Sequence, residues 1–504
     1  MKHFSKIMAA IIIALALTPF FANRVPLAQA AVTTIYVNDG TFNDPTVTFC
    51  PATPYITIQA GINAAMAPVG KNGVVIVCQG TYTEQPSYTG SVLYTHILVL
   101  KAKGNVDVRP PLNAFGPVFD IEYMKAATVT GFHINGLQRQ DPASVFGNGV
   151  FFQNVKAGMI SLNTISQIGD NYADANAEHA GITVYGTNVF DAAGNFLPFK
   201  VTITKNSIAY PKYRGIVVRG NVKPIISSNV VRMSGTGVPV PYGTVGIFLE
   251  NYRGRDAAAF CPALSTTPCK PIGGSILKNT IYGDYNAVSG SYMTGIEVYD
   301  SSNDVVQANK IHGMGLGIIV RDEYSTVNSF NGTAFDTMDN KVIGNSGTVL
   351  SFAVALVGQR NTNSAAAPWV FRNTISSNKF FEPTGQGSYG ILVNHEDTNP
   401  PCVSLPTPCS LFVDFDGKKN TVSYNTMLGY AVPYYFFPAL TAVSNKSGPP
   451  PAGQSPSEPQ PDMPLLPEYY AAPMVFEGPA AQQAQELWDA AQAANAGWQA
   501  VRHP

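Results

Sequence analysis

Two short phrases alternate through the middle of this chain at a nearly fixed offset. The first phrase is a Gly followed by Ile or Val, and it begins at Gly149, Gly181, Gly215, Gly246, Gly295, Gly317 and Gly390. The second resembles Asn-x-Ile and begins at Asn163, Asn206, Asn229, Asn279, Asn309, Asn340, Asn378 and Asn425. At three places the step from the first phrase to the second is 14 residues. Self-similarity of this kind indicates that one small unit is stacked along an axis.

Each phrase is short, rich in β-branched residues and bounded by turn-forming residues, which predicts a strand. We therefore expect two short strands and two corners in each repeat. With Ala353-Val-Ala-Leu counted as a variant of the first phrase, the step between successive first phrases varies from 22 to 49 residues, so the connections change in length while the strands keep their spacing. A propeller needs a more constant period. The pattern predicts an all-β chain folded as a right-handed parallel β-helix solenoid.

Inside such a coil, the residues after each Gly alternate between inward and outward positions. Ile182 and Val184 are expected to stack inward with their counterparts on other laps. The Asn of the second phrase is expected at a bend, with its amide bonded to the Asn of the next lap. These asparagines are interpreted as structural residues.

The repeats, together with an entry segment, resemble the pectin-lyase-like superfamily of right-handed parallel β-helix proteins. The entry segment comprises residues 35–40 (Ile-Tyr-Val-Asn-Asp-Gly), 55–65 (Tyr-Ile-Thr-Ile-Gln-Ala-Gly-Ile-Asn-Ala-Ala) and 74–84, which end in Gly80-Thr-Tyr-Thr-Glu84. The resemblance covers about residues 33–430. It implies a first strand, an N-terminal capping helix over 57–66 and a first full lap. It is specific for the fold and not for a reaction, because enzymes and non-enzymes share it.

The chain divides into four segments. Residues 1–30 read as a signal peptide, with Lys2 and Lys6 before an apolar run and Ala28-Gln-Ala30 at a cleavage site. A membrane anchor is the alternative, but the run is too short to span a bilayer. We therefore expect a secreted protein, extracellular or periplasmic, with no stable membrane span after signal removal.

The β-helix domain is expected over residues 31–445 and a Pro-rich linker over 446–479. Residues 480–504 then predict a C-terminal amphipathic helix with Leu487 and Trp498 on its apolar face. This tail packs either on its own chain or on a second subunit, in which case it mediates self-association.

Composition excludes one class of partner. The formal net charge is −1 and charged residues make up 12% of the chain. Nucleic acid is excluded as a partner, because phosphate binding needs concentrated Lys and Arg.

The six cysteines allow fifteen pairings. Closeness in sequence favours Cys50–Cys78, Cys261–Cys269 and Cys402–Cys409, which an exported protein keeps oxidised. A metal site is the alternative, but no Cys-x-x-Cys or paired His supports it. No metal and no cofactor are predicted; calcium stays open, although the sequence has no motif for it.

Residues at one offset from each Gly should form columns along the solenoid. The polar residues concentrate at the fourth to sixth positions after the Gly of several neighbouring laps. The candidate catalytic residues are Glu250, Asp300, Arg321, Asp322 and Glu323. The candidate substrate-binding residues are Tyr252, Tyr299, Tyr324, Arg219, His395 and Glu396. The two small cysteine loops leave the coil on one side and are expected to flank this column as the walls of a trough.

The acids in this set suit glycan hydrolysis, and Arg321 suits neutralisation of a uronate during elimination. The tyrosines suit stacking on sugar rings. The alternative is that acids and bases on adjacent laps pair with one another as a solvated ladder. A mostly apolar stripe two residues after each Gly, interrupted by Glu297, is expected to be covered.

No catalytic motif of the polygalacturonases, pectin methylesterases or pectate lyases is present. The sequence thus predicts an exported β-helix protein that engages an extended polysaccharide or glycan along one flank. If it is an enzyme, it is a polysaccharide lyase or a glycoside hydrolase. The alternative is a non-catalytic cell-surface, matrix or filament protein with a structural or interaction role.

Overall fold

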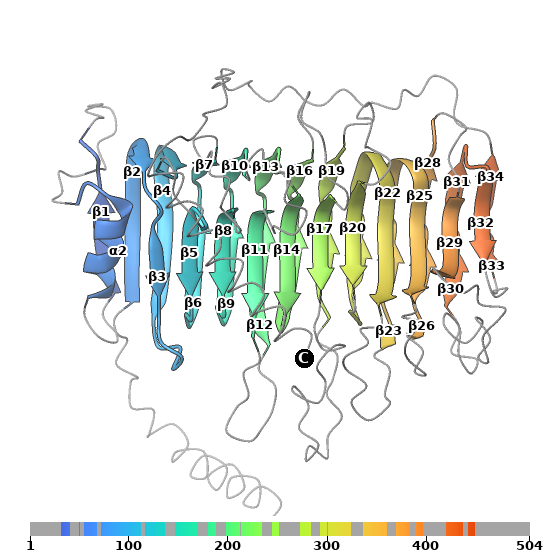
Figure 1. The fold of residues 1–504 in the computed structure, drawn as a ribbon, viewed down its shortest axis with the longest axis horizontal. Helices are drawn as coiled ribbons and strands as arrows, with labels where there is room; N and C mark the ends of the chain where they lie inside the picture. The colour runs from blue at the N-terminus through green and yellow to red at the C-terminus, as the bar shows by residue number, and fades with distance from the viewer. Residues whose placement is uncertain are drawn as a thin grey trace, which may run out of the picture.

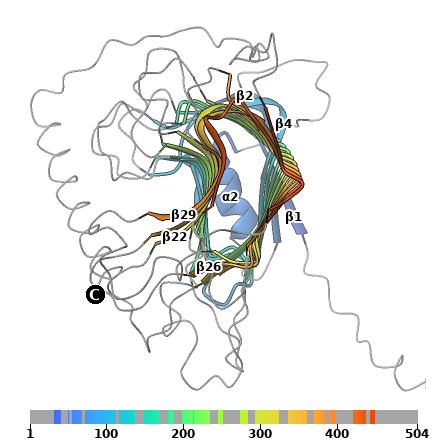
Figure 2. The same ribbon diagram turned by 90° about the vertical axis from the view of Figure 1, so that its right-hand side faces the viewer.

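The protein is a long parallel β-helix, seen from the side in Figure 1 and along its axis in Figure 2. The computed structural model describes residues 32–40, 50, 55–67, 72–111, 116–136, 147–168, 180–187, 198–211, 213–233, 244–250, 273–283, 293–299, 301–323, 336–359, 369–383, 389–396, 420–436 and 442–448. The predicted signal peptide, most of the predicted linker and the predicted C-terminal helix lie outside these residues.

Each lap holds three strands, so the strands form three parallel columns. Column A consists of β3 (Ser87–Thr89), β5 (Phe119–Glu122), β8 (Asn148–Gln153), β11 (Ala180–Gly186), β14 (Arg214–Gly220), β17 (Val245–Glu250), β20 (Thr294–Tyr299), the second halves of β22 (Lys310–Glu323) and β25 (Ser346–Gln359), β29 (Tyr389–Glu396) and β32 (Val432–Phe436).

Column B consists of β6 (Ala126–Thr130), β9 (Ala157–Ser161), β12 (Phe199–Thr204), β15 (Val222–Ser227), β18 (Ser275–Leu277), β21 (Val305–Gln307), β24 (Lys341–Ile343), β27 (Thr374–Ser376), β30 (Thr421–Ser423) and β33 (Ala442–Val443).

Column C consists of β7 (His133–Asn135), β10 (Thr164–Ser166), β13 (Ser207–Ala209), β16 (Val230–Arg232), β19 (Thr280–Tyr282), the first halves of β22 and β25, β28 (Lys379–Phe381), β31 (Thr426–Leu428) and β34 (Lys446–Gly448). Two further strands, β23 (Asp336–Met338) and β26 (Trp369–Phe371), pair only with each other.

Each lap has three strands, whereas the sequence predicted two. Column B has no Gly at its start to mark it, its strands carry Lys and Thr between the inward residues, and one of the inward residues is Pro224. Its alternating burial nevertheless shows a half-buried strand, with Val201 and Ile203 inside and Lys200 outside. The weaker pattern explains why the sequence reveals columns A and C more readily.

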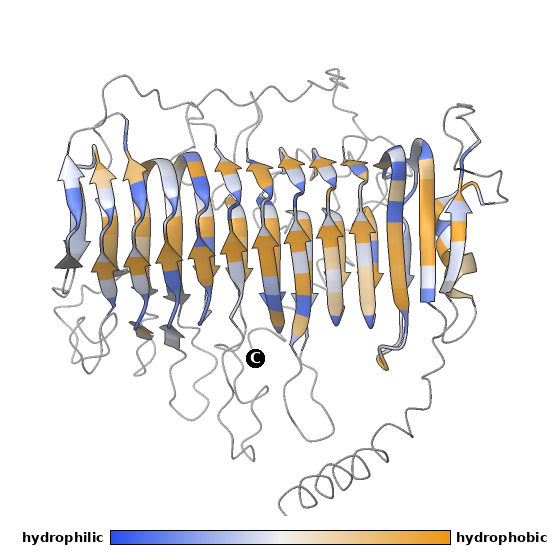
Figure 3. Cartoon of the chain, turned by 180° about the vertical axis from the view of Figure 1, so that it is seen from behind, coloured by the Kyte–Doolittle hydropathy of each residue, from blue (hydrophilic) through white to orange (hydrophobic). Residues whose placement is uncertain are grey.

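The interior is filled by aliphatic rows, as predicted. Ile182, Ile216, Ile247 and Ile296 are neighbours in register on successive strands of column A, and all are fully buried. Burial of side chains of this size stabilises the fold by about 1.5–3 kcal/mol each. Hydrophobic segments therefore recur on neighbouring strands across the sheet in Figure 3.

The repeated Gly is required by a close approach inside the coil. A Cβ at Gly215 would lie 2.4 Å from Cγ1 of Val231 and 2.5 Å from the carbonyl oxygen of Gly246 on the next lap. Gly149, Gly181, Gly246 and Gly295 have equivalent neighbours. The first phrase is therefore set by packing of column A against column C.

The asparagines form a buried ladder along one corner. The side-chain amide of Asn229 donates to Oδ1 of Asn279 (3.0 Å), and that of Asn279 donates to Oδ1 of Asn309 (3.0 Å). Each amide also donates to a carbonyl of the preceding lap, as Asn279 does to Ile226 (2.9 Å). The left-handed backbone lies on the residue before each Asn, for example Lys278 with φ 55°. The asparagines are structural, as expected, but the corner predicted for Asn340 is wrong: this residue belongs to a second ladder at the start of column B, and Asn345 takes its place in this one.

The N-terminal end is closed by a short helix, α2 (Ile58–Met66), which Figure 2 shows across the mouth of the coil. Thr57 caps it, since its hydroxyl accepts from the amide of Ala60 (3.1 Å). The Glu84 carboxylate accepts from the amides of Ile58 (2.7 Å) and Gln59 (2.9 Å). The Gly-Thr-Tyr-Thr-Glu84 phrase thus holds the capping helix on the first lap.

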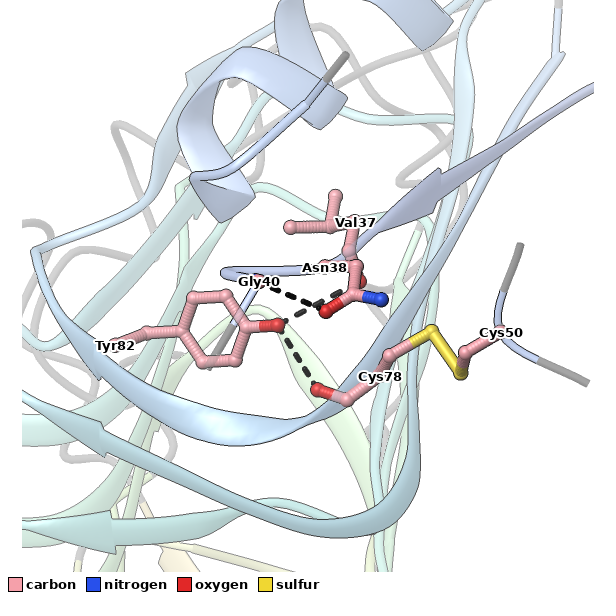
Figure 4. Close-up of a disulfide and its surroundings, with 6 residues drawn as sticks. All are labelled: Val37, Asn38, Gly40, Cys50, Cys78 and Tyr82. Atoms are coloured by element: carbon pink, nitrogen blue, oxygen red, sulfur yellow. Dashed lines mark hydrogen bonds between the residues drawn. A yellow bond between two sulfur atoms is a disulfide. The ribbon is translucent and has the colours of Figure 1, made fainter. Parts of the chain in front are cut away.

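The Cys50–Cys78 disulfide is confirmed, with its Cα atoms 6.0 Å apart. It ties Cys50 to strand β2 (Asn72–Thr83), beside β1 (Val32–Val37), as Figure 4 shows. In the same place, the Tyr82 hydroxyl donates to the carbonyl oxygen of Cys78 (2.9 Å). Cys261, Cys269, Cys402 and Cys409 lie outside the described residues, so their predicted pairings stay predictions.

Candidate functional site

The candidate site is the outer face of column A, which carries two rows of residues in register. Outer row 1 comprises Thr89, Glu122, Gln153, Tyr185, Arg219, Glu250, Tyr299, Arg321, Val357 and Asn394. Outer row 2 comprises Ser87, Asp120, Phe151, Thr183, Val217, Phe248, Glu297, Ile319, Ala355 and Leu392. The predicted column from Tyr185 to Asn394 is thus confirmed residue by residue as part of outer row 1.

Arg219 and Glu250 form a buried ion pair between adjacent laps. Nε of Arg219 lies 2.9 Å from Oε2 of Glu250, and the side chains are only 7% and 5% exposed. Burial of an ion pair removes both charges from water, so each needs the other. In this pair the expected ladder of acids and bases is present, but it is buried instead of solvated.

Arg321 occupies the edge of the same site. Its Nε lies 2.6 Å from Oε1 of Glu297, and its guanidinium lies 4.7 Å from the ring centre of Tyr299. Glu297 is 8% exposed, whereas Arg321 is 32% exposed. The acid that interrupts the apolar stripe is therefore neutralised by an arginine of the next lap, and that arginine remains accessible.

An apolar cluster separate from the interior lies on this outer face. It comprises Ala180, Val217, Val245, Phe248 and Tyr299, all buried. The Phe248 ring lies 5.9 Å from that of Tyr299 and has the guanidinium groups of Arg214 and Arg219 at 4.4 Å and 5.2 Å. The expectation that the apolar stripe is covered is confirmed for Val217 and Phe248, the two members of this cluster that belong to the stripe.

The other candidates are placed only in part. Asp322 and Glu323 end β22, where they pair in register with Gly358 and Gln359 of β25. His395 and Glu396 follow at the same positions of β29. Their backbones thus continue the predicted columns. Asp300, Tyr252 and Tyr324 lie outside the described residues, as do the cysteine loops expected to form the trough walls.

The structure adds two acids that the repeats do not reveal. Asp120 and Glu122 of β5 lie on outer rows 2 and 1, each three laps before its counterpart on β14, Val217 or Arg219. Their lap has Val118 where later laps have Gly, so the first phrase is absent there. The signal that remains is the alternation Phe119-Asp-Ile-Glu122, with Phe119 and Ile121 fully buried.

Asp120 is the least compensated of the described carboxyl groups on this face. Its Oδ1 is buried and has no hydrogen-bond partner, either among the described residues or beyond them. Burial, and after it the charge of Glu122, raises the pKa of Asp120 to about 7. Burial also raises the pKa of Glu122. Perturbed acids without partners are typical of functional sites.

Asp304 shows the contrasting structural case. Burial raises its pKa to about 7, but its oxygens accept from the amide of Gly274 and the hydroxyl of Ser301, each at 2.5 Å. It stands at the start of a second ladder, whose next member, Asn340, accepts from its backbone amide (2.8 Å). Asp304 therefore serves the fold.

Two further features bear on the site. In the part of the chain that the structure describes, no three His, Cys, Asp or Glu residues gather as metal ligands would. None of the helices found there is long and apolar enough to cross a membrane.

The sequence matches no protein-family model and no curated protein. Solved structures that resemble the chain at low identity include the following three. The A-module of mannuronan C-5 epimerase AlgE6 from Azotobacter vinelandii is 14% identical, with 78% of this chain and 95% of that one covered and a TM-score of 0.33. The PL6-family polysaccharide lyase Pedsa3628 from Pseudopedobacter saltans is 13% identical, with 75% and 87% covered and a TM-score of 0.39.

ORF18 of Geobacillus virus E2 is 10% identical, with 65% and 53% covered and a TM-score of 0.37. The strand register of the chain itself carries the assignment of its fold. The protein is a parallel β-helix, the fold class that its resemblance to the pectin-lyase-like superfamily predicts.

Proposed function

We propose that the protein binds an extended polysaccharide along the outer face of column A. The observation that carries this proposal is the continuity of outer row 1, in which charged, amide and aromatic side chains follow one another lap by lap. Neighbouring laps are about 4.8 Å apart. A linear ligand that follows the row meets its partly exposed members Glu122, Gln153, Tyr185 and Arg321, whereas Arg219, Glu250 and Tyr299 are buried beneath what covers them.

Arg321 is the residue best suited to contact such a ligand. It is partly exposed while its neighbours Glu297 and Tyr299 are buried and hold it in place from two sides. A guanidinium fixed in this way presents its remaining donors to the hydroxyl or carboxylate groups of a sugar. Arg219 has its charge matched internally by Glu250, which suits a supporting role.

A second candidate function, hydrolysis of the bound glycan, is favoured by Asp120 and Glu122. The two residues are two positions apart on one face of β5, which separates them by about 6.6 Å along the strand. Inverting glycosidases place their two carboxyl groups about 6.5–9.5 Å apart. A pKa of about 7 keeps much of Asp120 protonated near neutral pH, as a general acid requires.

Binding is tested by titrating the full chain with polygalacturonate, alginate and a neutral glucan. We expect Arg321→Ala to weaken binding of the preferred polymer about tenfold, or ~1.4 kcal/mol. The matched control is Lys379→Ala, which removes one exposed cation from column C. An equal effect of the two substitutions, or no effect of Arg321→Ala, would contradict the proposed site. Absence of binding to every polymer would favour the structural or interaction role.

Hydrolysis is tested by following reducing ends, with absorbance of unsaturated products recorded in parallel. We expect reducing ends without unsaturated products, and their loss in Asp120→Asn with binding retained. Unsaturated products would indicate elimination and would remove Asp120 as the general acid. Asp304→Asn is the control, because it changes an acid of similar pKa that lies in a structural ladder.

A further inference from the structure

The outer face of column B carries a group of exposed lysines that contrasts with the paired charges of column A. The group lies on the laps from β4 (Ile97–Arg109) to β18 and is exposed throughout. We define this lysine face by Lys101 of β4, Lys125 before β6, Lys200 of β12, Lys223 of β15, and Lys205 and Lys278 at the corners that follow β12 and β18. Figure 3 views column B from outside.

These lysines lack acidic partners. The described strands of column B from β6 to β21 contain no Asp or Glu. None of the six lysines takes part in an ion pair, with a described residue or with any other. On the outer face of column A, by contrast, Arg219 and Arg321 each have a glutamate.

The register brings two of the charges side by side. Lys200 and Lys223 are direct partners on adjacent strands, with no residue between them. Like charges directly opposite one another in a sheet destabilise it. The chain as a whole has a net charge of −1, so its composition does not force lysines together here. An anion bound across this pair would remove the repulsion.

The rest of the face is flat and rich in hydroxyl groups. The hydroxyl of Ser161 donates to Oγ1 of Thr130, and that of Ser227 donates to Oγ1 of Thr204, each at 3.0 Å. At the outward positions two residues before Ser161 and Ser227, Met159 and Ile225 are 44% and 46% exposed. A ligand lying across several laps would therefore meet cations, hydroxyl groups and small apolar areas in alternation.

These features favour one class of polyanion over two others. A nucleic acid would be expected to find arginine for base edges or aromatic rings for stacking, and the described outer face of column B from β6 to β21 has neither. A membrane surface would require apolar groups inserted about 5–10 Å deep. Met159 and Ile225 are two single apolar residues, each more than half buried and flanked on its strand by polar or small outward residues, which is less apolar surface than such insertion needs.

We propose that this lysine face binds an acidic polysaccharide, one bearing carboxylate or sulfate groups along its length. The polymer lies across the laps, and Lys200 and Lys223 at the centre of the face hold its anionic groups. This surface is separate from the outer face of column A, and it does not depend on a glycan being bound there.

The test measures binding of the full chain to immobilised polygalacturonate at low salt and at about 0.15 M salt. The variant is the pair Lys200→Gln with Lys223→Gln. Loss of each lysine is expected to weaken binding about fivefold, so the double variant should bind about 25-fold more weakly at low salt. We also expect its binding to depend less on salt than that of the unaltered chain. The matched control is Lys310→Gln with Lys379→Gln, two exposed lysines of column C that change the net charge equally. The control is expected to bind as the unaltered chain does.

Four outcomes would overturn the proposal. They are unchanged binding by the Lys200 and Lys223 variant, equal loss in the control, equal or tighter binding to phosphatidylglycerol vesicles, and equal or tighter binding to single-stranded DNA. Far-UV circular dichroism verifies that each variant is folded. The two sites can be distinguished with the same polymer. If its binding depends on Lys200 and Lys223 but is unchanged by Arg321→Ala, the result supports the lysine face and contradicts the column A site.

Discussion

The outer faces of columns A and B are built on the same laps and use charge in opposite ways. On column A the charges lie among aromatic rings, they are mostly buried, and Arg219 and Arg321 are each paired with a glutamate. On column B the lysines are exposed and lack acids. The comparison shows that a net charge near zero does not reveal how a solenoid distributes its charges over its faces. The fold determines where each charged side chain lies, whereas composition gives only the sum of the charges.

The largest predicted effect is on column A, where Glu250→Ala leaves Arg219 buried without its anion. We expect a loss of about 3–5 kcal/mol in the free energy of unfolding, measured by urea denaturation. The matched change on column B, Lys223→Ala, is expected to cost less than about 0.5 kcal/mol. Similar values for the two substitutions would remove the contrast between the faces.

Arg321→Ala is predicted to have an intermediate effect, because its partner Glu297 is buried while Arg321 is partly exposed. We expect a loss of about 1–2 kcal/mol, reflecting an acid left without its cation. Adding Glu297→Gln should recover at least half of that loss. Failure of this second change to restore stability would show that Arg321 acts through its contact with Tyr299 instead.

Asp120→Asn is predicted to stabilise the protein in a pH-dependent way. The unfolded pKa of Asp is about 3.9 and the folded pKa is about 7, so the folded state holds an extra proton between these values. Folding is therefore favoured at low pH, and this advantage is lost as the pH rises through about 7. We expect the Tm of the variant to gain about 2 °C or more on the unaltered chain between pH 4 and pH 8. A constant difference in Tm across this range would contradict the assignment.

The smallest predicted effect on stability is that of Lys200→Gln with Lys223→Gln. Removing two adjacent like charges should raise the free energy of unfolding slightly at low salt, by less than about 0.5 kcal/mol, and leave it unchanged at high salt. Thermal unfolding at two salt concentrations measures this. Destabilisation at low salt would mean that the lysines have partners within the chain.

The sequence predicts much of this fold because the repeat carries the register. The positions of Arg219, Glu250, Tyr299 and Arg321 in one row follow from counting residues after each Gly. Close packing requires that Gly on the laps of Gly149, Gly181, Gly215, Gly246 and Gly295. The Asn ladder and the capping helix over 57–66 follow from local chemistry in the same way.

The sequence did not predict the features of the fold and the site that fall outside the repeated phrases. Asp120 and Glu122 escaped notice because Val118 replaces the Gly that marks later laps. Column B escaped because a strand exposed on one face has only two or three inward residues and no Gly or Asn phrase of its own to mark it. The burial of Glu250 could not be foreseen, because it depends on what packs against the outer face.

The most direct test of this account is a double-mutant cycle on Arg219 and Glu250, residues brought together only by the stacking of laps. We measure the free energy of unfolding of Arg219→Ala, Glu250→Ala and the double variant. The account predicts a coupling of at least about 2 kcal/mol, so that the double variant is nearly as stable as either single one. Additive effects of the two substitutions would contradict it.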